Sequence, residues 1–524
     1  MNVLGFLRRK TSAEQPLVAI DVTPISAGSE NGGAKIFVQQ LLHGLAARRR
    51  HRYLLLTAPW NHESFAGFEA AGMTRLCLDA GNQNVGPLRA RERFWSRRRR
   101  VGSLRERGVS LLFCPMTDPV HAERGIPTVC TVYDLQHLAY PGFFTAAERA
   151  TRDGFFRRVA HTASGVVCIS EFTRGEAIDR LGLPPERVWS IPLAVQHRLT
   201  PPSEDAVRQV RARFGVSDAP YAFYPANGWP HKNHRLLLLG FSQLLAERPE
   251  IPIHLVLAGN LLDAGANLQQ AVARMGLTQR VHLTGFVSDE ELAALWRGAF
   301  CLVFPSLYEG FGIPLLEAMQ FGTPIVCSRL QSLVEVGGDA ARYIDPRRPG
   351  DIAAALQELF DNPSVGRELS ERGAQRLHRF LPSDMTERYL NVLDEVCSRG
   401  VQERMPLVEG VFDDRWIGPV VTVLAGPSQH KRIWDFEIHF PDSLPHSKAS
   451  VRADFEGRKV RTLRLGRGET SHLQIDVPPA GGWVRLDVTP SFVPRTNGDF
   501  RELTVQLVRG QLRESRTSEV VFEV

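Results

Sequence analysis

Two glutamates flank a glycine loop in the second half of this chain. Glu309 is followed by Gly310, Phe311 and Gly312, and Glu317 lies about one turn into the helix that is expected next. Carboxylates accept hydrogen bonds from neighbouring hydroxyl groups, and a glycine loop that leads into a helix N-terminus can bind phosphate. This combination predicts a ligand that carries both phosphate and hydroxyl groups, such as a nucleotide-sugar.

The elements expected around this loop are a strand, a helix and a second strand. The apolar run at 300–304 predicts a buried strand, and Pro314 suits the first turn of a helix that ends near Gly322. Residues 323–327 predict the next strand. A glutamate near a helix start is also stabilised by the helix dipole alone, but the whole ordered string favours a ligand site.

The string at 301–327 resembles the Glu-x7-Glu signature of the retaining glycosyltransferases of group 1, which have the GT-B fold. The resemblance implies that the first glutamate and the loop amides face the donor sugar, and that the second glutamate binds the ribose. The residues that it assigns to the donor are Glu309, Gly310, Phe311, Gly312, Ile313 and Glu317.

A second loop follows the strand expected at 221–225 and contains Asn227, His231 and Lys232. A single lysine in such a loop is ordinarily solvated. In the resembled family, however, this loop approaches the donor phosphates, often with an arginine where Asn227 stands here. A departing diphosphate needs a nearby cation when no metal is bound. We therefore predict that Lys232 is catalytic together with Glu309, and that Asn227 and His231 lie at the donor.

A Gly-Gly pair, Gly32 and Gly33, follows the first expected strand at 17–22 and precedes a helix pattern at 34–47. The pair does not form a G-x-G-x-x-G fingerprint, which argues against a dinucleotide site. In the resembled family a Gly-Gly loop at this point approaches the donor phosphates and the acceptor. An ordinary tight turn is the alternative.

Tyr133 and Asp134 lie at the end of the strand expected at 127–133, and ligands bind at the carboxyl ends of strands in open α/β sheets. The family usually has His-Asp here, with the histidine touching the donor sugar. Tyr133 stands in the place of that histidine and can still hydrogen-bond a hydroxyl group. His137 could substitute for it or be structural. We predict Asp134 as the third catalytic residue, acting toward the acceptor, with local hydrogen bonding within its loop as the alternative.

Two further positions near strand ends are of interest. Phe286 and Val287 follow the strand at 281–285 and are predicted to contact the nucleotide base, with strand-end packing as the alternative. Ser170 is the expected N-cap of a helix that begins at Glu171, and the family has the same Ser-Glu-x-Thr run near its interdomain crevice.

Alternating strand and helix patterns predict an α/β fold with two Rossmann-like domains in the GT-B arrangement, followed by an all-β sandwich-like domain. The predicted boundaries are an N-terminal extension at 1–16, an acceptor domain at 17–199, a donor domain at 200–400 and a β domain at 401–524. A last helix at 380–399 is expected to cross back to the acceptor domain. The β domain is predicted to bind glycan, a partner or itself.

Composition limits the partners. A net charge of +6 fits anionic substrates or an anionic membrane surface better than nucleic acid. An arginine-rich helix expected at 88–107 could lie on a membrane or be a solvated face. Seven scattered cysteines predict reduced thiols, and the N-terminal apolar run is too short for a signal peptide. We expect a cytoplasmic protein that binds the inner membrane face only peripherally.

With the resemblance, these features predict a metal-independent, cofactor-free, retaining glycosyltransferase that uses a UDP-, GDP- or dTDP-linked hexose or deoxyhexose. The expected acceptor is a glycan or a lipid-linked glycan of bacterial surface polysaccharide or lipopolysaccharide. A sugar-nucleotide epimerase or a phosphorylase shares the two-domain plan, although no lysine stands out for pyridoxal phosphate. A non-catalytic glycan- or partner-binding scaffold is the other alternative. Tyr133 and Asn227 favour the scaffold, whereas Lys232, Glu309 and Glu317 argue against it.

Overall fold

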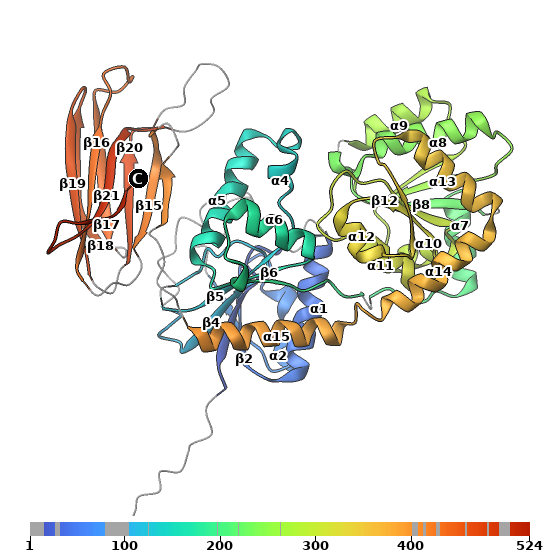
Figure 1. Cartoon of the computed structure of the whole chain (residues 1–524), viewed down its shortest axis with the longest axis horizontal. Coiled ribbons are helices and arrows are strands. Elements are labelled where there is room, and N and C mark those ends of the chain that lie inside the picture. Colours follow the sequence, from blue (N-terminus) through green and yellow to red (C-terminus); the bar gives the residue numbers. More distant parts are fainter. Residues whose placement is uncertain are drawn as a thin grey trace, which may run out of the picture.

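The computed structural model in Figure 1 contains two α/β domains followed by an all-β domain, which confirms the predicted fold class. It describes residues 15–26, 32–78, 104–123, 125–195, 198–217, 219–261, 264–400, 407–411, 415–425, 430–455, 458–478, 482–491 and 503–523. Most of the arginine-rich segment at 88–107 and nearly all of the extension at 1–16 lie outside these residues. The predicted domain boundaries stay predictions.

The first domain is built on a seven-stranded sheet in the order β3-β2-β1-β4-β5-β6-β7, with all neighbouring strands parallel. Its strands are β1 (Leu17–Asp21), β2 (Arg52–Thr57), β3 (Thr74–Cys77), β4 (Val109–Cys114), β5 (Thr128–Val132), β6 (Gly165–Cys168) and β7 (Val188–Ser190). The central strands are mostly apolar because the sheet is buried on both faces. Sequence reasoning missed β3, an edge strand without fully buried residues.

Two helices of this domain, α5 and α6, begin with side-chain caps that the sequence provides. Ser170 accepts a hydrogen bond from the amide of Thr173 and is the N-cap of α6, as predicted, while Thr145 forms a capping box with Glu148 at α5. The helices are α1 (Gly32–Arg48), α2 (Gly67–Ala70), α4 (Gln136–Ala139), α5 (Ala146–Thr162) and α6 (Glu171–Leu181), with 3-10 turns η1 (Glu63–Phe65), η3 (Pro141–Phe143) and η4 (Pro185–Arg187).

The second domain repeats this plan with a six-stranded parallel sheet in the order β10-β9-β8-β11-β12-β13. Its strands are β8 (Tyr221–Pro225), β9 (His254–Ala258), β10 (Val281–Gly285), β11 (Cys301–Phe304), β12 (Ile325–Ser328) and β13 (Ala341–Ile344). In both sheets the order reverses beside the first strand of the domain. That reversal is where ligands bind in doubly wound folds.

The helices of the second domain include α11, which follows the glycine loop. Gly312, at its N-cap, has a φ of 105°, a left-handed conformation that favours glycine. The helices are α7 (Glu204–Arg213), α8 (His234–Glu247), α9 (Ala264–Arg274), α10 (Asp289–Gly298), α11 (Ile313–Gln320), α12 (Gln331–Gly337), α13 (Pro349–Asp361) and α14 (Pro363–Leu377), with the 3-10 turn η5 (Pro230–Lys232).

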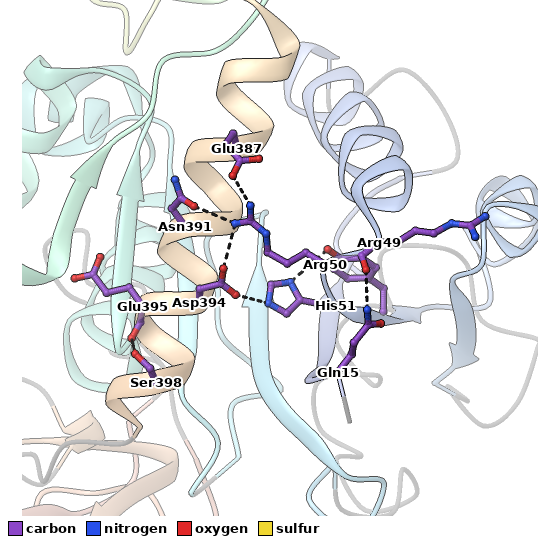
Figure 2. Close-up of polar contacts among 10 residues, drawn as sticks. Gln15, Arg49, Arg50, His51, Glu387, Asn391, Asp394, Glu395 and Ser398 are labelled. Carbon is purple, nitrogen blue, oxygen red and sulfur yellow. Dashed lines mark hydrogen bonds and ion pairs between the residues drawn. The ribbon is translucent and has the colours of Figure 1, made fainter. Parts of the chain in front are cut away.

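Helix α15 (Pro382–Arg399) crosses back from the second domain and packs against α1 of the first, as predicted (Figure 1). Figure 2 shows the polar contacts that fasten it. Arg50, just beyond α1, pairs with Glu387 and with Asp394, whose carboxylate is 3.1 Å away. Nε2 of His51 lies 2.7 Å from the other Asp394 oxygen. The end of α1 and the last helix are therefore held together.

The C-terminal domain is a pair of antiparallel sheets in the orders β14-β15-β20-β17-β18 and β19-β16-β21-β22, with a separate hydrophobic core between them. Its strands are β14 (Leu407–Val411), β15 (Ile417–Ala425), β16 (Arg432–His439), β17 (Lys448–Phe455), β18 (Arg458–Gly466), β19 (Thr470–Val477), β20 (Gly482–Thr489), β21 (Gln506–Glu514) and β22 (Val520–Glu523). Sequence reasoning missed β14 and β18. Strand β18 gives a weak signal in the sequence because it is a largely exposed edge strand rich in basic residues.

Gly44 of α1 is where α15 approaches most closely, and it gives a direct test of this packing. A Cβ on Gly44 would lie 2.2 Å from Oγ1 and 2.9 Å from Cγ2 of Thr386. Gly44→Ala should therefore lower the melting temperature, because overpacking costs about 1–3 kcal/mol and exceeds the gain in helix propensity of about 1 kcal/mol. Differential scanning fluorimetry measures the shift.

Gly175→Ala is the matched control, because Gly175 lies inside α6 and a Cβ there would meet nothing within 4 Å. It should leave the melting temperature unchanged or raise it. Adding Thr386→Ala to Gly44→Ala should recover part of the loss. Equal melting temperatures for the two single variants would contradict the described packing of α15.

Candidate active site

The predicted residues of the two halves gather where the loop after β11 meets the first domain. The hydroxyl of Ser170 donates to the carbonyl of Gly310 at 2.7 Å, and the hydroxyl of Tyr140 donates to the carbonyl of Leu307 at 3.1 Å. A Cβ on Gly310 would lie 2.0 Å from the carbonyl oxygen of Tyr133. Only glycine allows this approach, so the residue type at 310 is set by contact between the two domains.

Lys232 and Glu309 form an ion pair, with Nζ 2.6 Å from Oε1. The side chains are only 17% and 12% exposed, so the pair is largely shielded from water. Burial alone would raise the pKa of Glu309, but the charge of Lys232 and its hydrogen bond hold that pKa below its usual value. Two of the three residues that the sequence predicts to be catalytic thus neutralise each other here.

Contacts of the neighbouring backbone hold Lys232 in place. The hydroxyl of Tyr224 in β8 donates to the Lys232 carbonyl at 2.6 Å, and the Leu307 amide donates to the His231 carbonyl at 2.7 Å. Burial, reinforced by the Lys232 charge, lowers the pKa of His231 to about 4. His231 is therefore neutral near pH 7, and Lys232 is the charged group beside Glu309.

Glu317 lies in α11 and is almost fully buried. Burial raises its pKa, an effect that Arg198 partly offsets from 3.2 Å. Arg198 also pairs with Asp289 at the start of α10. The link between the domains thus supplies a cation beside the predicted ribose-binding carboxylate. Sequence reasoning missed Arg198, which lies in no motif.

Two helix N-termini meet at this junction. Gly32 begins α1, and Gly312 precedes α11. A Cβ on Gly33 would lie 2.8 Å from Cδ1 of Ile313, so the two helix starts lie close together. Both helix dipoles therefore place partial positive charge at one point of the junction, next to the glycine loop that follows Glu309, an arrangement suited to a phosphate group.

The predicted residues after β5 have partners within the first domain. The hydroxyl of Tyr133 donates to the carbonyl of Pro115 at 2.8 Å, and its ring packs edge-on against Phe37. Asp134 accepts a hydrogen bond from the Gln136 amide at 3.0 Å. His137 is buried and stacks on Phe156, which matches the structural role offered for it.

The remaining predicted donor residues differ in exposure. Phe286 is 72% exposed and free to meet a planar ligand, whereas the Phe311 side chain is 2% exposed and packs against Phe380. Phe311 can therefore serve a ligand only through its backbone. The side-chain oxygen of Asn227 accepts from the Asn260 amide at 3.0 Å, which ties together the loops after β8 and β9.

Three further observations concern the described residues. They contain no group of three or more His, Cys, Asp or Glu side chains arranged to hold a metal ion. None of their helices is both long and apolar enough to cross a membrane. The cysteines form no disulfide, in line with the prediction of free thiols.

Comparison with known proteins divides the chain in the same way as the two parallel sheets. Residues 208–376 match the family described as Glycosyl transferases group 1, and residues 31–199 match Glycosyltransferase Family 4. The chain is 30% identical over 263 residues to the O-antigen chain mannosyltransferase B of Escherichia coli, covering 50% of this chain and 69% of that protein. It is 33% identical over 223 residues to the MMP alpha-(1->4)-mannosyltransferase of Mycolicibacterium hassiacum, covering 42% and 51%.

Solved structures share the fold of the two α/β domains. Anabaena HepE, in complex with UDP and glucose, superposes with a TM-score of 0.56 at 18% identity, covering 73% of this chain and all of HepE. A sucrose-phosphate synthase from Thermosynechococcus elongatus gives a TM-score of 0.58 at 21% identity, covering 74% and 100%. At these identities the likeness shows the fold alone.

If Lys232 and Glu309 form an ion pair, substitutions at the two positions should have non-additive effects on the free energy of unfolding, which denaturation can measure. Lys232→Met should lower the free energy of unfolding by about 3 kcal/mol, because it leaves a mostly buried carboxylate without its partner. The double variant Lys232→Met/Glu309→Gln should lose clearly less, because no unpaired charge remains. Urea titration of the four proteins gives the coupling. Strictly additive losses would show that the pair does not form in solution.

Replacing Glu317 should stabilise the protein at neutral pH, whereas replacing Lys232 should destabilise it. Because its pKa is raised on folding, the folded chain binds this proton more tightly than the unfolded chain. The resulting stability is full below the ordinary value of 4.5 and is lost as the pH rises through the folded pKa. Glu317→Gln should therefore raise the melting temperature at pH 7.5 and leave it unchanged near pH 4.

Glu371→Gln, at an exposed position of α14, is the control and should change little at either pH. The measurement is the melting temperature of wild type and both variants between pH 4 and 8. A lower melting temperature of Glu317→Gln at pH 7.5 would mean that the ion pair with Arg198 outweighs the cost of burying the carboxylate.

Proposed function

This chain belongs to the group 1 glycosyltransferases, and on that basis we propose that it transfers a sugar from a nucleotide-sugar to a glycan or lipid-linked acceptor, with retention of the anomeric configuration and without a metal ion or cofactor. The observation that carries the proposal is the convergence of Lys232, Glu309 and two helix N-termini at one junction. These groups together match the charge of a diphosphate and the hydroxyl groups of a sugar.

The donor is held mainly by the second domain. Lys232 and the N-termini of α1 and α11 neutralise the diphosphate, which requires Lys232 to exchange part of its contact with Glu309 for phosphate oxygens. Glu309, once relieved of that contact, accepts hydrogen bonds from the sugar. Glu317 binds the ribose, and the exposed ring of Phe286 packs on the base.

In the transfer step the bond between the anomeric carbon and the diphosphate oxygen breaks, and its electron pair leaves with the diphosphate. The acceptor hydroxyl oxygen forms the new bond on the same face of the sugar. Its proton passes to the departing phosphate oxygen, which lies on that face as well. Lys232 contributes by stabilising the charge that develops on the leaving group. Asp134, half-buried beside Gly310, is placed to orient the acceptor.

The relatives narrow the substrates further. Because both relatives described above are named mannosyltransferases, mannose is the first donor sugar to test. The name of the Escherichia coli relative refers to O-antigen chains, which supports an acceptor in bacterial surface polysaccharide. An acceptor of that kind, if lipid-linked, would bring the protein to the cytoplasmic face of a membrane without a spanning segment.

A donor panel tests this proposal. Wild type and Glu317→Ala are heated with UDP-glucose, GDP-mannose and a dTDP-linked deoxyhexose, each at about 100 times an affinity of 10 µM, where a specific ligand adds about 2.7 kcal/mol of stability. We expect one nucleotide class to raise the melting temperature of wild type, and Glu317→Ala to lose most of that shift. Proton NMR of the glycoside formed by wild type then gives the anomeric configuration.

The configuration of the product, binding without turnover and the metal dependence of turnover decide between the candidate functions. Product with the anomeric configuration of the donor supports the proposal, and inverted product overturns retention. Binding of a glycan without turnover of any donor would favour a non-catalytic scaffold on the same fold. Turnover that is unchanged by ethylenediaminetetraacetate supports metal independence, and turnover that is restored only by added Mg²⁺ or Mn²⁺ overturns it.

A further inference from the structure

The loop that leads into α11 is oriented in part by the opposite domain. The carbonyl of Gly310 accepts hydrogen bonds from Ser170 Oγ at 2.7 Å and from Thr173 Oγ1 at 3.3 Å. Both hydroxyl groups belong to the first turn of α6 and its N-cap, and both residues are fully buried. Two side chains of the first domain thus fix one peptide group of the second.

The direction of that carbonyl determines the direction of the next amide. In a planar trans peptide the C=O and N–H bonds point in opposite directions. Because the Gly310 carbonyl is turned toward α6, the Phe311 amide is turned away from it. The preceding peptide is held likewise, since Ser332 Oγ donates to the Glu309 carbonyl at 2.6 Å. The Gly310 and Phe311 amides donate no hydrogen bond within the described part of the chain.

Because residue 310 is glycine, the peptide that follows it has two possible orientations. Turning over the Gly310–Phe311 peptide rotates ψ of Gly310 and φ of Phe311 together, and glycine tolerates either value of ψ, so Gly310 itself offers no resistance. The turned-over peptide would direct a carbonyl, rather than an amide, away from α6. A carbonyl cannot donate to a sugar hydroxyl or to a phosphate oxygen.

We propose that Ser170, supported by Thr173, is a positioning residue that holds the Gly310–Phe311 peptide so that the Phe311 amide faces the donor sugar. This inference rests on the proposed function and deepens it. The sugar-binding part of the donor site is then completed by the acceptor domain. The nucleotide part, at Glu317 and Lys232, belongs to the donor domain and is independent of Ser170.

Other contacts between the domains keep α6 and the glycine loop in position for the hydrogen bond from Ser170 to Gly310. The Tyr308 hydroxyl accepts from the Leu135 amide at 3.1 Å and donates to Glu176 of α6. The Glu335 carboxylate accepts from the Glu171 amide at 2.9 Å, at the start of the same helix. Helix α6 is therefore fastened to the second domain at Glu171 in its first turn and at Glu176 in its second turn.

The test compares a nucleotide-sugar with its nucleotide. Binding of GDP-mannose and GDP, and of UDP-glucose and UDP, is measured by isothermal titration for wild type, Ser170→Ala and Thr173→Val. We expect Ser170→Ala to weaken the sugar-linked form by about tenfold and the free nucleotide by less than about twofold. Thr173→Val, which keeps its shape, should act in the same direction but less strongly. Ser170→Thr retains a hydroxyl and should restore the preference for the sugar-linked form.

Thr145→Ala is the matched control, because Thr145 caps α5 through the same kind of contact but does not touch the loop. It should lower stability and leave both affinities unchanged. If Ser170→Ala weakens the nucleotide and the nucleotide-sugar equally, Ser170 acts only as a helix cap and the inference is overturned. Unchanged affinities in both variants that lose a hydroxyl group, Ser170→Ala and Thr173→Val, would also overturn the inference, while the proposed function would stand. If wild type binds neither of these nucleotide-sugars nor the dTDP-linked deoxyhexose of the donor panel, both proposals fail.

Discussion

Two carboxylates are buried at the carboxyl edge of the second parallel sheet, and each needs a cation beside it. Glu309 receives Lys232 from the loop after β8, and Glu317 receives Arg198 from the link between the domains. A buried carboxylate without such a partner would be costly, so the loops that carry the cations must follow the sheet edge closely. The site is therefore held in shape by its own charges, and a diphosphate can take over one of these contacts.

The same edge must also meet the first domain without a steric clash. Gly310 leaves no room for a side chain against the Tyr133 carbonyl, and Gly33 approaches Ile313 in a similar way. On the far side of the first domain, α15 is fastened by Arg50 and His51 (Figure 2). The two α/β domains are thus joined at two places, one formed by the loops of the site and the other by a long helix. Substrate contacts can change at the first while the second keeps the domains together.

The C-terminal domain differs from the other two in how it is stabilised. Its two antiparallel sheets enclose a separate core around Trp434 and Phe436, and β14 lies against α5 of the first domain. Its outer strand β18 carries exposed basic residues along an unpaired edge, which is a common protection against edge-to-edge association. The two α/β domains thus contain the whole candidate site, and the β domain is an addition to them.

The sequence by itself determined most of the elements and their order, with β3, β14 and β18 as exceptions, because buried strands, helix caps and glycine loops depend on residues that are close along the chain. It also singled out Lys232, Glu309 and Glu317. Tertiary structure alone decided which groups meet: Lys232 and Glu309 are 77 residues apart, and Ser170 and Gly310 are 140 apart. No local pattern encodes such pairs, nor the turning of the Tyr133 hydroxyl toward Pro115, because they arise only when loops that are distant along the chain meet at the edge of one sheet or between the two domains.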